Sequence, residues 1–253
     1  MRVVALQSGS NGNSIYVEAG DARLLFDAGI SGRQAELRLA ERGRDIRNVD
    51  AVFISHDHHD HIRCAGIYHR KFGLPVYVTR PTLRAASAGM DLGAISVLRH
   101  FRAGSAVRVD GVAVETVRTP HDGADGVAFV VDDGRRRLGI LTDLGHVFDG
   151  LAELIGTLDA VLIETNYDPG MLAHGPYPAF LKRRIRGHGG HLSNVETAEL
   201  LRVAGRNLAW AALGHLSEEN NRPGLALETV SSAVGGLPLH LAGRYAATDV
   251  LNV

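Results

Sequence analysis

The sequence has very little that would tie the chain to a membrane, a disulfide framework or a polyanion. Cys64 is its only cysteine, which excludes an internal disulfide and fits a reducing compartment. No segment approaches the ~20 apolar residues of a membrane span, and the opening MRVVALQSGSNGNS has too short an apolar run for a signal peptide. The formal net charge is −1, so any polyanion site must be a local basic patch. We therefore expect a cytoplasmic protein without membrane contact, and no motif for a protein partner is visible.

Short β-branched and apolar runs, bounded by Gly, Asn and Asp turn residues, alternate with helical patterns in two successive parts of the chain. Strands are expected at 3–7, 14–20, 23–29, 51–55, 75–79, 106–111, 112–119, 127–133, 137–143, 160–165, 208–213 and 237–242. Helices are expected at 31–43, 61–73, 179–186, from 193 onward and 225–235. No linker-like stretch separates the two parts. The order predicts one α/β domain over residues 1–253, with two mixed β-sheets packed face to face and helices outside.

The segment SHDHHDH, residues 55–61, holds four candidate metal ligands: His56, His58, Asp60 and His61. Residues i and i+2 of an extended segment point the same way, so His56 and His58 share a face and His59 points away. A helix that begins near Asp60 would turn Asp60 and His61 toward a second point close by. Imidazole and carboxylate hold Zn²⁺ at ~2.0–2.2 Å. Four such groups directly after the apolar strand AVFIS favour a metal site over a solvated polar loop.

Three further candidate ligands also stand directly after predicted strands. His121 follows ETVRTP, Asp143 follows LGILT, and His215 follows AWAALG. Open α/β folds gather their sites outside the carboxyl ends of strands, so we expect these groups to meet the 55–61 segment in one cleft. Seven ligands are too many for one Zn²⁺ and suit two divalent ions, with Asp143 bridging them. Zn²⁺, Mn²⁺ and Fe²⁺ all accept His and Asp ligands.

Together with Asp27 in LLFDAG, these residues resemble the ordered motif set of the metallo-β-lactamase superfamily. The resemblance implies an αββα sandwich, with two mixed β-sheets flanked by helices. It also implies two metal sites that share Asp143, one with His56, His58 and His121 and the other with Asp60, His61 and His215. Asp27 would support the ligands by hydrogen bonding. True β-lactamases commonly carry cysteine where this chain has Asp143, which argues against antibiotic hydrolysis.

Within that superfamily the chain resembles the YycJ/WalJ branch. The motifs that carry this resemblance are SGSNGNS at 8–14, PHD at 120–122, TDLG at 142–145, ETN at 164–166, GHLSN at 190–194 and HLSEENN at 215–221. The SGSNGNS segment reads as a hairpin turn whose side chains could line the metal cleft. Cys64 departs from the branch, where glycine is frequent three residues after His61, and this departure leaves the ligands intact. The resemblance implies metal-dependent 5′-to-3′ exonuclease activity on DNA.

The quartet GHLS occurs twice, at 190–193 and 214–217. His215 in the second copy fills the last ligand position, whereas His191 in the first copy follows the basic segment LKRRIRGHGG. We expect His191 to contact the scissile phosphate or to protonate the leaving oxygen, and a packing role is the alternative. Side chains or N–H groups around it that could bind phosphate are those of Lys182, Arg183, Arg184, Arg186, Ser193 and Asn194. For the arginines, a solvated helix face is the alternative.

The predicted reaction is phosphodiester hydrolysis at a dinuclear centre, with a hydroxide that bridges the two metal ions as nucleophile. Two divalent ions, two carboxylates and one hydroxide leave a net positive centre, which favours an anionic phosphodiester. Asp60, Asp143 and His191 form the predicted catalytic group, and nucleic acid, DNA in particular, is the predicted substrate.

Three alternatives stay open from the sequence. A PhnP-like enzyme that opens cyclic ribose phosphates usually carries extra cysteines for a structural zinc, and this chain has one cysteine. A thioesterase of the glyoxalase II type usually extends into a C-terminal helical region. A non-catalytic metal-binding protein is disfavoured because no ligand is missing.

Overall fold

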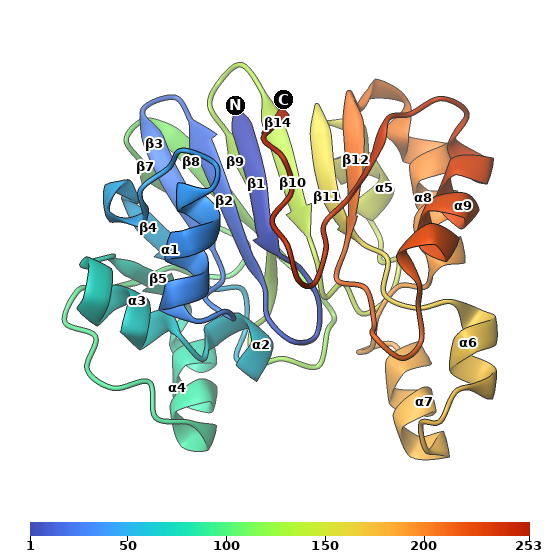
Figure 1. The fold of residues 1–253 in the computed structure, drawn as a ribbon, viewed down its shortest axis with the longest axis horizontal. Helices are drawn as coiled ribbons and strands as arrows, with labels where there is room; N and C mark the ends of the chain where they lie inside the picture. Colours follow the sequence, from blue (N-terminus) through green and yellow to red (C-terminus); the bar gives the residue numbers. More distant parts are fainter.

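Two mixed β-sheets of seven strands each face one another in the computed structural model, which describes residues 1–253 (Figure 1). In order across the first sheet, the strands are β14 (Leu251–Asn252), β1 (Arg2–Gln7), β2 (Ser14–Ala19), β3 (Ala22–Phe26), β4 (Ala51–Phe53), β5 (Val76–Val78) and β6 (Leu98–His100). Across the second sheet, they are β13 (Leu239–Leu241), β12 (Trp210–Gly214), β11 (Ala160–Glu164), β10 (Arg137–Leu141), β9 (Val127–Asp132), β8 (Val112–Arg118) and β7 (Ala106–Val109). The predicted pair of mixed sheets is confirmed.

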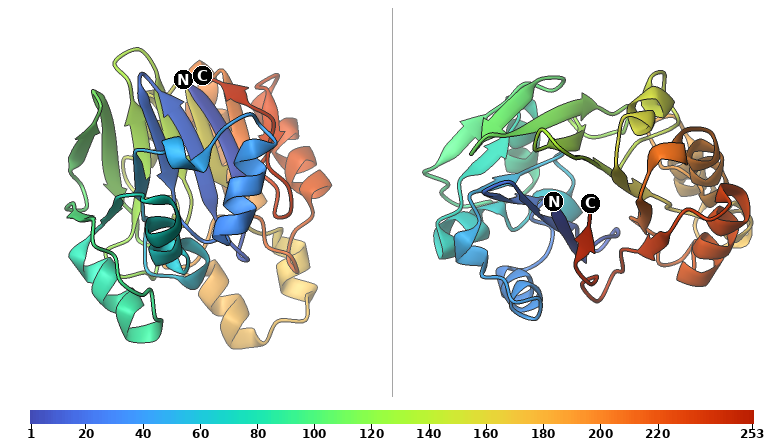
Figure 2. Two further views of the ribbon diagram at one scale, coloured as in Figure 1. Left: turned by 60° about the vertical axis from the view of Figure 1, so that its left-hand side comes forward. Right: turned by 90° about the horizontal axis from the view of Figure 1, so that it is seen from above.

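Helices cover the outer faces of both sheets, which completes the four layers of the αββα sandwich (Figure 2). The helices are α1 (Gly32–Ala40), α2 (His59–Ile62), α3 (Ala65–Phe72), α4 (Arg80–Gly89), α5 (Leu151–Gly156), α6 (Pro169–His174), α7 (Ala179–Arg186), α8 (Asn194–Ala204) and α9 (Pro223–Val234). Short 3₁₀ helices lie at Ile46–Asn48 and Gly205–Asn207. None of these helices has the length and apolar content that crossing a bilayer requires.

The apolar core consists of three layers. Between the sheets, Phe26 and Phe53 of the first sheet pack against Phe129 of the second, and the ring centroids of Phe26 and Phe129 are 5.0 Å apart. The outer face of the first sheet packs against α1 and α3, and that of the second against α5, α8 and α9. Strands β4 and β11 are buried along their whole length, which explains why their sequences are continuous apolar runs rather than alternating ones.

The single helix predicted at 61–73 is divided into α2 and α3. The chain leaves the helical conformation at Cys64 (φ −106°, ψ 7°), whose backbone N–H donates to the Ala28 carbonyl at 2.9 Å. This bond holds the end of α2 against the loop after β3. The prediction of one continuous helix was wrong because it followed the apolar pattern across this local contact.

The loops that carry the predicted ligands leave the sheets at one edge. Strands β8 and β10 both pair antiparallel with β9, and β10, β11 and β12 pair parallel, so these four strands end at the same edge. Helices α2 and α7 lie there, at the bottom of Figure 1. The two chain ends lie side by side at the opposite edge, where β1 pairs with β14 (Figures 1 and 2).

Candidate metal centre

The 55–61 segment leaves β4 and then turns into the short helix α2. His58 is the N-cap of α2 and has an extended backbone (φ −65°, ψ 145°), so Asp60 and His61 lie in the helix that follows. The ring centroids of His56 and His58 are 4.6 Å apart, and those of His56 and His61 are 4.1 Å apart. His59 is exposed. The segment thus has the expected extended-then-helical geometry, and it gathers three imidazoles at one point.

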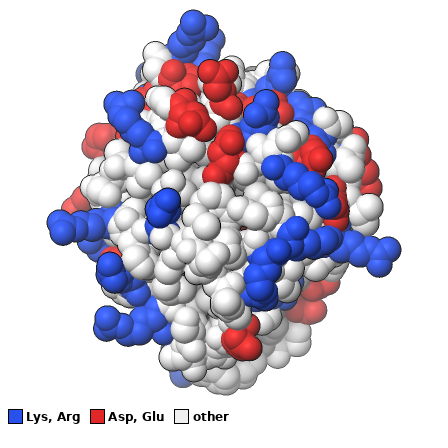
Figure 3. Space-filling model, turned by 90° about the vertical axis from the view of Figure 1, so that its left-hand side faces the viewer, with Lys and Arg blue, Asp and Glu red and all other residues white.

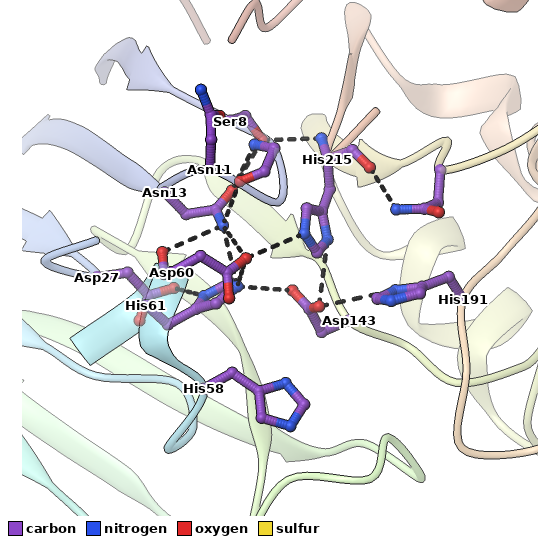
Figure 4. A network of polar contacts seen from close by, with 12 residues as sticks. Ser8, Asn11, Asn13, Asp27, His58, Asp60, His61, Asp143, His191 and His215 are labelled. Atoms are coloured by element: carbon purple, nitrogen blue, oxygen red, sulfur yellow. Dashed lines mark hydrogen bonds and ion pairs between the residues drawn. The ribbon is translucent and has the colours of Figure 1, made fainter. Parts of the chain in front are cut away.

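Asp143, two residues after β10, lies in the middle of the cluster (Figure 4). Its carboxylate oxygens are 3.3 Å from His61 Nε2, 3.5 Å from His121 Nε2 and 3.2 Å from His215 Nδ1. His215 directly follows β12, and its Nε2 lies 3.6 Å from Asp60 Oδ2. The loops after β8, β10 and β12 therefore meet the 55–61 segment in one place.

The nitrogen and oxygen atoms that could bind metal form compact sets, in each of which all atoms lie within 4.8 Å of one another. Two of these sets are His56 with His58 and His121, and Asp60 with His61 and His215. They contain the same residues as the two ligand groups expected from the sequence. A third set joins Asp143 to His56 and His61, which places the Asp143 carboxylate between the first two.

Three buried atoms of these side chains have no hydrogen-bond partner: His56 Nε2, Asp143 Oδ2 and His215 Nδ1. His215 Nδ1 is close to Asp143 Oδ1, but the contact lacks hydrogen-bond geometry. Buried polar atoms are normally paired, because an unpaired one costs about 1–3 kcal/mol. Imidazole nitrogens and carboxylate oxygens open toward a common point are the donor set that divalent metal ions accept. The residues present therefore fit metal ions.

Charge within the cluster is divided between carboxylates and imidazoles. Burial, and then the neighbouring His61, lower the pKa of His56 well below its usual value, which favours the neutral imidazole that a metal ion would require. Burial also opposes charge on His61 and His215, but Asp143 and the other carboxylates around them raise the pKa of both rings well above the usual value. Burial opposes ionisation of Asp60, yet His61 beside it holds the pKa of this carboxyl low. Metal ions would therefore take the place of protons on His61 and His215.

Backbone strain is concentrated at this cluster. Asp27 (φ 65°), Asp143 (φ 55°) and His215 (φ 52°) all adopt the left-handed conformation. This conformation costs a residue other than glycine about 1 kcal/mol or more, although Asp and His tolerate it better than most. Each of the three stands within two residues of a strand end, where the sharp turn aims its side chain into the cluster.

Asp27 orients the His61 ring of the cluster through hydrogen bonds. Its Oδ2 accepts a hydrogen bond from His61 Nδ1 at 2.7 Å and another from Ser55 Oγ at 2.9 Å, and its Oδ1 accepts from the Ser55 backbone N–H at 2.8 Å. These bonds fix the His61 ring so that its Nε2 faces Asp60 and Asp143. Asp27 thus hydrogen-bonds one predicted ligand, His61, and Ser55 is an additional partner that the sequence did not single out.

The 8–14 segment lines the cluster from the first sheet (Figure 4). Asn13 Nδ2 lies 3.0 Å from His61 Nε2 and 3.3 Å from Asp60 Oδ2. Ser8 Oγ accepts a hydrogen bond from the His215 backbone N–H at 2.9 Å. The segment therefore holds ligands from both sheets in place, beyond its role as the turn between β1 and β2.

Replacing Asp27 by asparagine is expected to weaken metal binding by about 10- to 100-fold, because the His61 ring loses its charged hydrogen-bond acceptor. Asparagine keeps the size of the side chain and tolerates the left-handed backbone, so the fold should persist. Competition of the protein with a chelating dye measures the metal affinity. Asp21→Asn, at an exposed position beyond β2, is the matched control. An unchanged metal affinity in the Asp27 variant would contradict the supporting role.

Glu164, the last residue of β11, is a site residue that the sequence analysis missed. It is fully buried, its Oε1 lies 2.5 Å from His191 Nδ1 and 3.6 Å from His215 Nδ1, and its Oε2 accepts from the Leu144 N–H. Burial opposes its ionisation, but His191 lowers the pKa of Glu164 to about 2. The signal that identified His121, a polar group at the end of a strand, is also present at Glu164.

The two GHLS quartets begin with glycines that have different neighbours. A Cβ on Gly190 would lie 2.0 Å from the Ile185 carbonyl at the end of α7, and a Cβ on Gly214 would lie 2.8 Å from Ser8 Oγ. Asn166 joins the two quartets, because its Nδ2 donates to the His215 carbonyl and its N–H to the Leu192 carbonyl. The repeated quartet thus places two histidines next to Glu164 at the end of β11, His215 in the predicted metal cluster and His191 beside it.

The basic residues of α7 occupy different environments. Arg184 Nε donates to Asp122 Oδ2 at 2.6 Å, and Asp122 Oδ1 lies 3.4 Å from His58 Nε2. Partial burial opposes ionisation of Asp122, but Arg184 lowers its pKa. Lys182 Nζ donates to a backbone carbonyl, whereas Arg183 is exposed and forms no ion pair. The helix is thus tied to the ligand loop by one ion pair.

The start of α8 is occupied by contacts within the fold. Ser193 forms the expected capping box with Glu196, whose Oε2 accepts from the Ser193 N–H at 2.8 Å. The Asn194 N–H donates to the Tyr167 carbonyl, and its side chain bonds with Asn221. Both residues are buried. Their backbone N–H groups are therefore already satisfied, and the expectation that they bind a phosphate finds no support in these contacts.

The sequence matches a family model described as a β-lactamase superfamily domain over residues 22–212. Exodeoxyribonuclease WalJ from Streptococcus pneumoniae is 38% identical over 230 residues, which cover 89% of this chain and 85% of that protein. Exodeoxyribonuclease YycJ from Bacillus anthracis is 33% identical over 230 residues, covering 90% of this chain and 87% of that protein. Among solved structures, the metallo-β-lactamase fold protein YhfI from Bacillus subtilis superposes with a TM-score of 0.75 at 16% identity, over 98% of this chain and 99% of that one.

Proposed function

The chain belongs to the β-lactamase superfamily, and from this premise we propose that it is a metal-dependent exodeoxyribonuclease that hydrolyses phosphodiester bonds of DNA. The observation that carries the proposal is the pair of ligand sets around Asp143, with His191 and Glu164 directly beside them. The relatives named exodeoxyribonucleases, which match about nine-tenths of the chain, support DNA as the substrate. The single cysteine fits a reducing compartment, so we propose the cytoplasm as the location.

We propose that the protein holds two divalent ions, Zn²⁺ or Mn²⁺ with Fe²⁺ as a further option. One ion would be bound by His56, His58 and His121 and the other by Asp60, His61 and His215, with Asp143 shared between them. Bound ions of this kind supply a nucleophilic water at neutral pH and stabilise negative charge on phosphate oxygens.

His191 is proposed as the residue that protonates the leaving oxygen. Its Nδ1 is held by Glu164, so Nε2 is the nitrogen left to face the substrate. The side chain is 21% exposed, whereas those of His121 and His215 are both 2% exposed, which gives His191 access to the mouth of the site. Glu164 is a positioning residue, because its carboxylate holds Nδ1 and so fixes the orientation of the His191 ring.

Removal of the metal tests the proposal. Protein dialysed against a chelator is expected to release no nucleotides from 5′-end-labelled duplex DNA, and added Mn²⁺ or Zn²⁺ should restore the release. Hydrolysis of bis(p-nitrophenyl) phosphate, measured in parallel, reports the metal centre without DNA. If the reloaded protein hydrolyses only this small ester, the substrate is a small phosphodiester. Bound metal without turnover of either substrate would make the protein a non-catalytic metal binder.

A further inference from the structure

A basic groove lies next to the metal centre, between the start of α4, the end of β6 and the end of β8. It has a volume of about 520 Å³, and its charged lining residues are Arg80, Arg102, Arg118 and Asp125. It belongs to the side of the molecule that carries α4, on the left of Figure 1; Figure 3 shows this side, where arginine and lysine side chains project around an uncharged area. This groove was not part of any site expected from the sequence.

The charge of the groove is not neutralised within the protein. Asp125 is the one acidic residue of the lining, and it pairs with Arg118 at 2.7 Å. Arg80 and Arg102 are exposed, and neither guanidinium forms an ion pair or a hydrogen bond. Exposed arginines usually gain little from surface pairing, but two unpaired ones that line the same concave surface form a local positive field.

The groove is joined to the metal centre by the loop at 119–126. His121 stands at one end of this loop and Asp125 near the other. The loop is held on both sides, because the Ala124 N–H donates to Asp57 Oδ1 at 2.7 Å and the Ala124 carbonyl accepts from Thr82 Oγ1 of α4 at 2.7 Å. The groove and the ligand loop are therefore fixed relative to one another.

We propose that this groove binds the phosphodiester backbone of the DNA strand a few nucleotides away from the scissile bond. The proposal rests on the proposed function and adds the surface that selects a polymer over a small ester. Arginine suits this task, because its planar guanidinium binds phosphate oxygens in pairs.

The length of the loop between the metal centre and the groove limits how far along the DNA strand the groove can act. His121 and Asp125 are four residues apart, so the loop between them spans at most about 14 Å. A DNA strand advances about 3.4 Å per nucleotide along the helix axis, so the groove reaches phosphates up to about four nucleotides from the metal centre.

Helix α7 lies on the other side of the metal centre, where Arg183 is also exposed and unpaired (Figure 1). A strand that runs from α7 across the cluster into the groove would meet positive charge on both sides of the scissile bond. The two basic surfaces lie on separate elements, so they can be removed independently.

The test is the double substitution Arg80→Gln and Arg102→Gln in the metal-loaded protein. The probe is a fluorescent DNA strand of about 12 nucleotides with hydrolysis-resistant phosphorothioate linkages, and the Kd is measured by anisotropy across a range of salt concentrations. Two lost phosphate contacts are expected to raise the Kd about 10- to 30-fold at ~0.1 M salt and to reduce the slope of log Kd against log salt by about 1.4, since the probe is single-stranded. Hydrolysis of bis(p-nitrophenyl) phosphate should stay unchanged.

The matched control is Arg135→Gln with Arg206→Gln, which removes the same charge from exposed, unpaired arginines at the opposite edge of the sheets. A Kd and salt slope like those of this control would overturn the groove proposal. If the groove variant weakens DNA binding while the wild type fails to degrade DNA, the groove stands and the exonuclease proposal falls. If the wild type degrades DNA and the groove variant binds DNA normally, the exonuclease proposal stands and the groove proposal falls.

Discussion

The Asp143→Asn variant is expected to lose at least about 10³-fold in turnover of DNA and of bis(p-nitrophenyl) phosphate, together with much of its bound metal. The Asp143 carboxylate contacts predicted ligands of both sets, at 3.3 Å from His61 and 3.5 Å from His121. Asparagine has the same size and tolerates the left-handed backbone at this position (φ 55°), so the fold should be retained. It removes the negative charge and turns an NH₂ group toward the imidazoles.

Turnover and metal content should be measured on the same preparation, because the expected loss links the two. Asp149→Asn is the control, since Asp149 is exposed and follows the same strand. A variant that keeps its metal at the wild-type level and more than a tenth of the turnover would show that Asp143 is not shared between two sites.

His191→Ala is expected to lower the turnover of DNA by about 10²- to 10⁴-fold while the metal content stays unchanged. The reason is that His191 lies next to the ligands, with its ring centroid 4.9 Å from that of His121, but is held by Glu164. Bis(p-nitrophenyl) phosphate should be affected much less, because nitrophenolate leaves without needing a proton. This difference between the two substrates separates a proton donor from a residue that only packs.

Glu164→Gln should reproduce most of the same defect, because the carboxylate acts through His191. The losses of the single variants should not add in the double variant, since both remove the same unit. His188→Ala, in the same loop and exposed, is the control. Equal losses on DNA and on the nitrophenyl ester, with metal released, would instead make His191 part of the metal cluster.

Much of the fold was predictable because its central strands are buried on both faces and read as uninterrupted apolar runs. The AVFIS and AVLIET runs correspond to β4 and β11, and Ser193 with Glu196 fixed the start of α8 within one residue. Helix α4 was missed although Thr79 caps it and Pro81 stands in its first turn, because only Thr82 and Ala86 are buried and its apolar face is narrow. The local sequence pattern alone therefore did not distinguish α4 from a loop.

The cluster histidines were predictable from spacing, and Asp27 from the family resemblance, whereas the other supporting residues were not. Ser55 and Asn13 act through contacts between segments distant in sequence, such as the 3.0 Å approach of Asn13 to His61. Glu164 has no neighbouring ligand in the sequence, and only the pairing of β11 between β10 and β12 brings it beside His191. The sequence also did not show that Tyr167 and Asn221 contact Asn194 at the start of α8, where an anion site remains a prediction.

The division of the ligands between the two sheets has a consequence for the molecule as a whole. His56 and His58 come from the first sheet and find their third partner, His121, on the second. Asp60 and His61 depend in the same way on His215. Each of these two proposed metal sites therefore takes side chains from both halves of the sandwich, so the metal centre lies where the halves join. A metal ion that binds only when the two halves are joined stabilises the joined form by mass action. The stability of the folded sandwich and the activity of the enzyme then depend on the same bound metal.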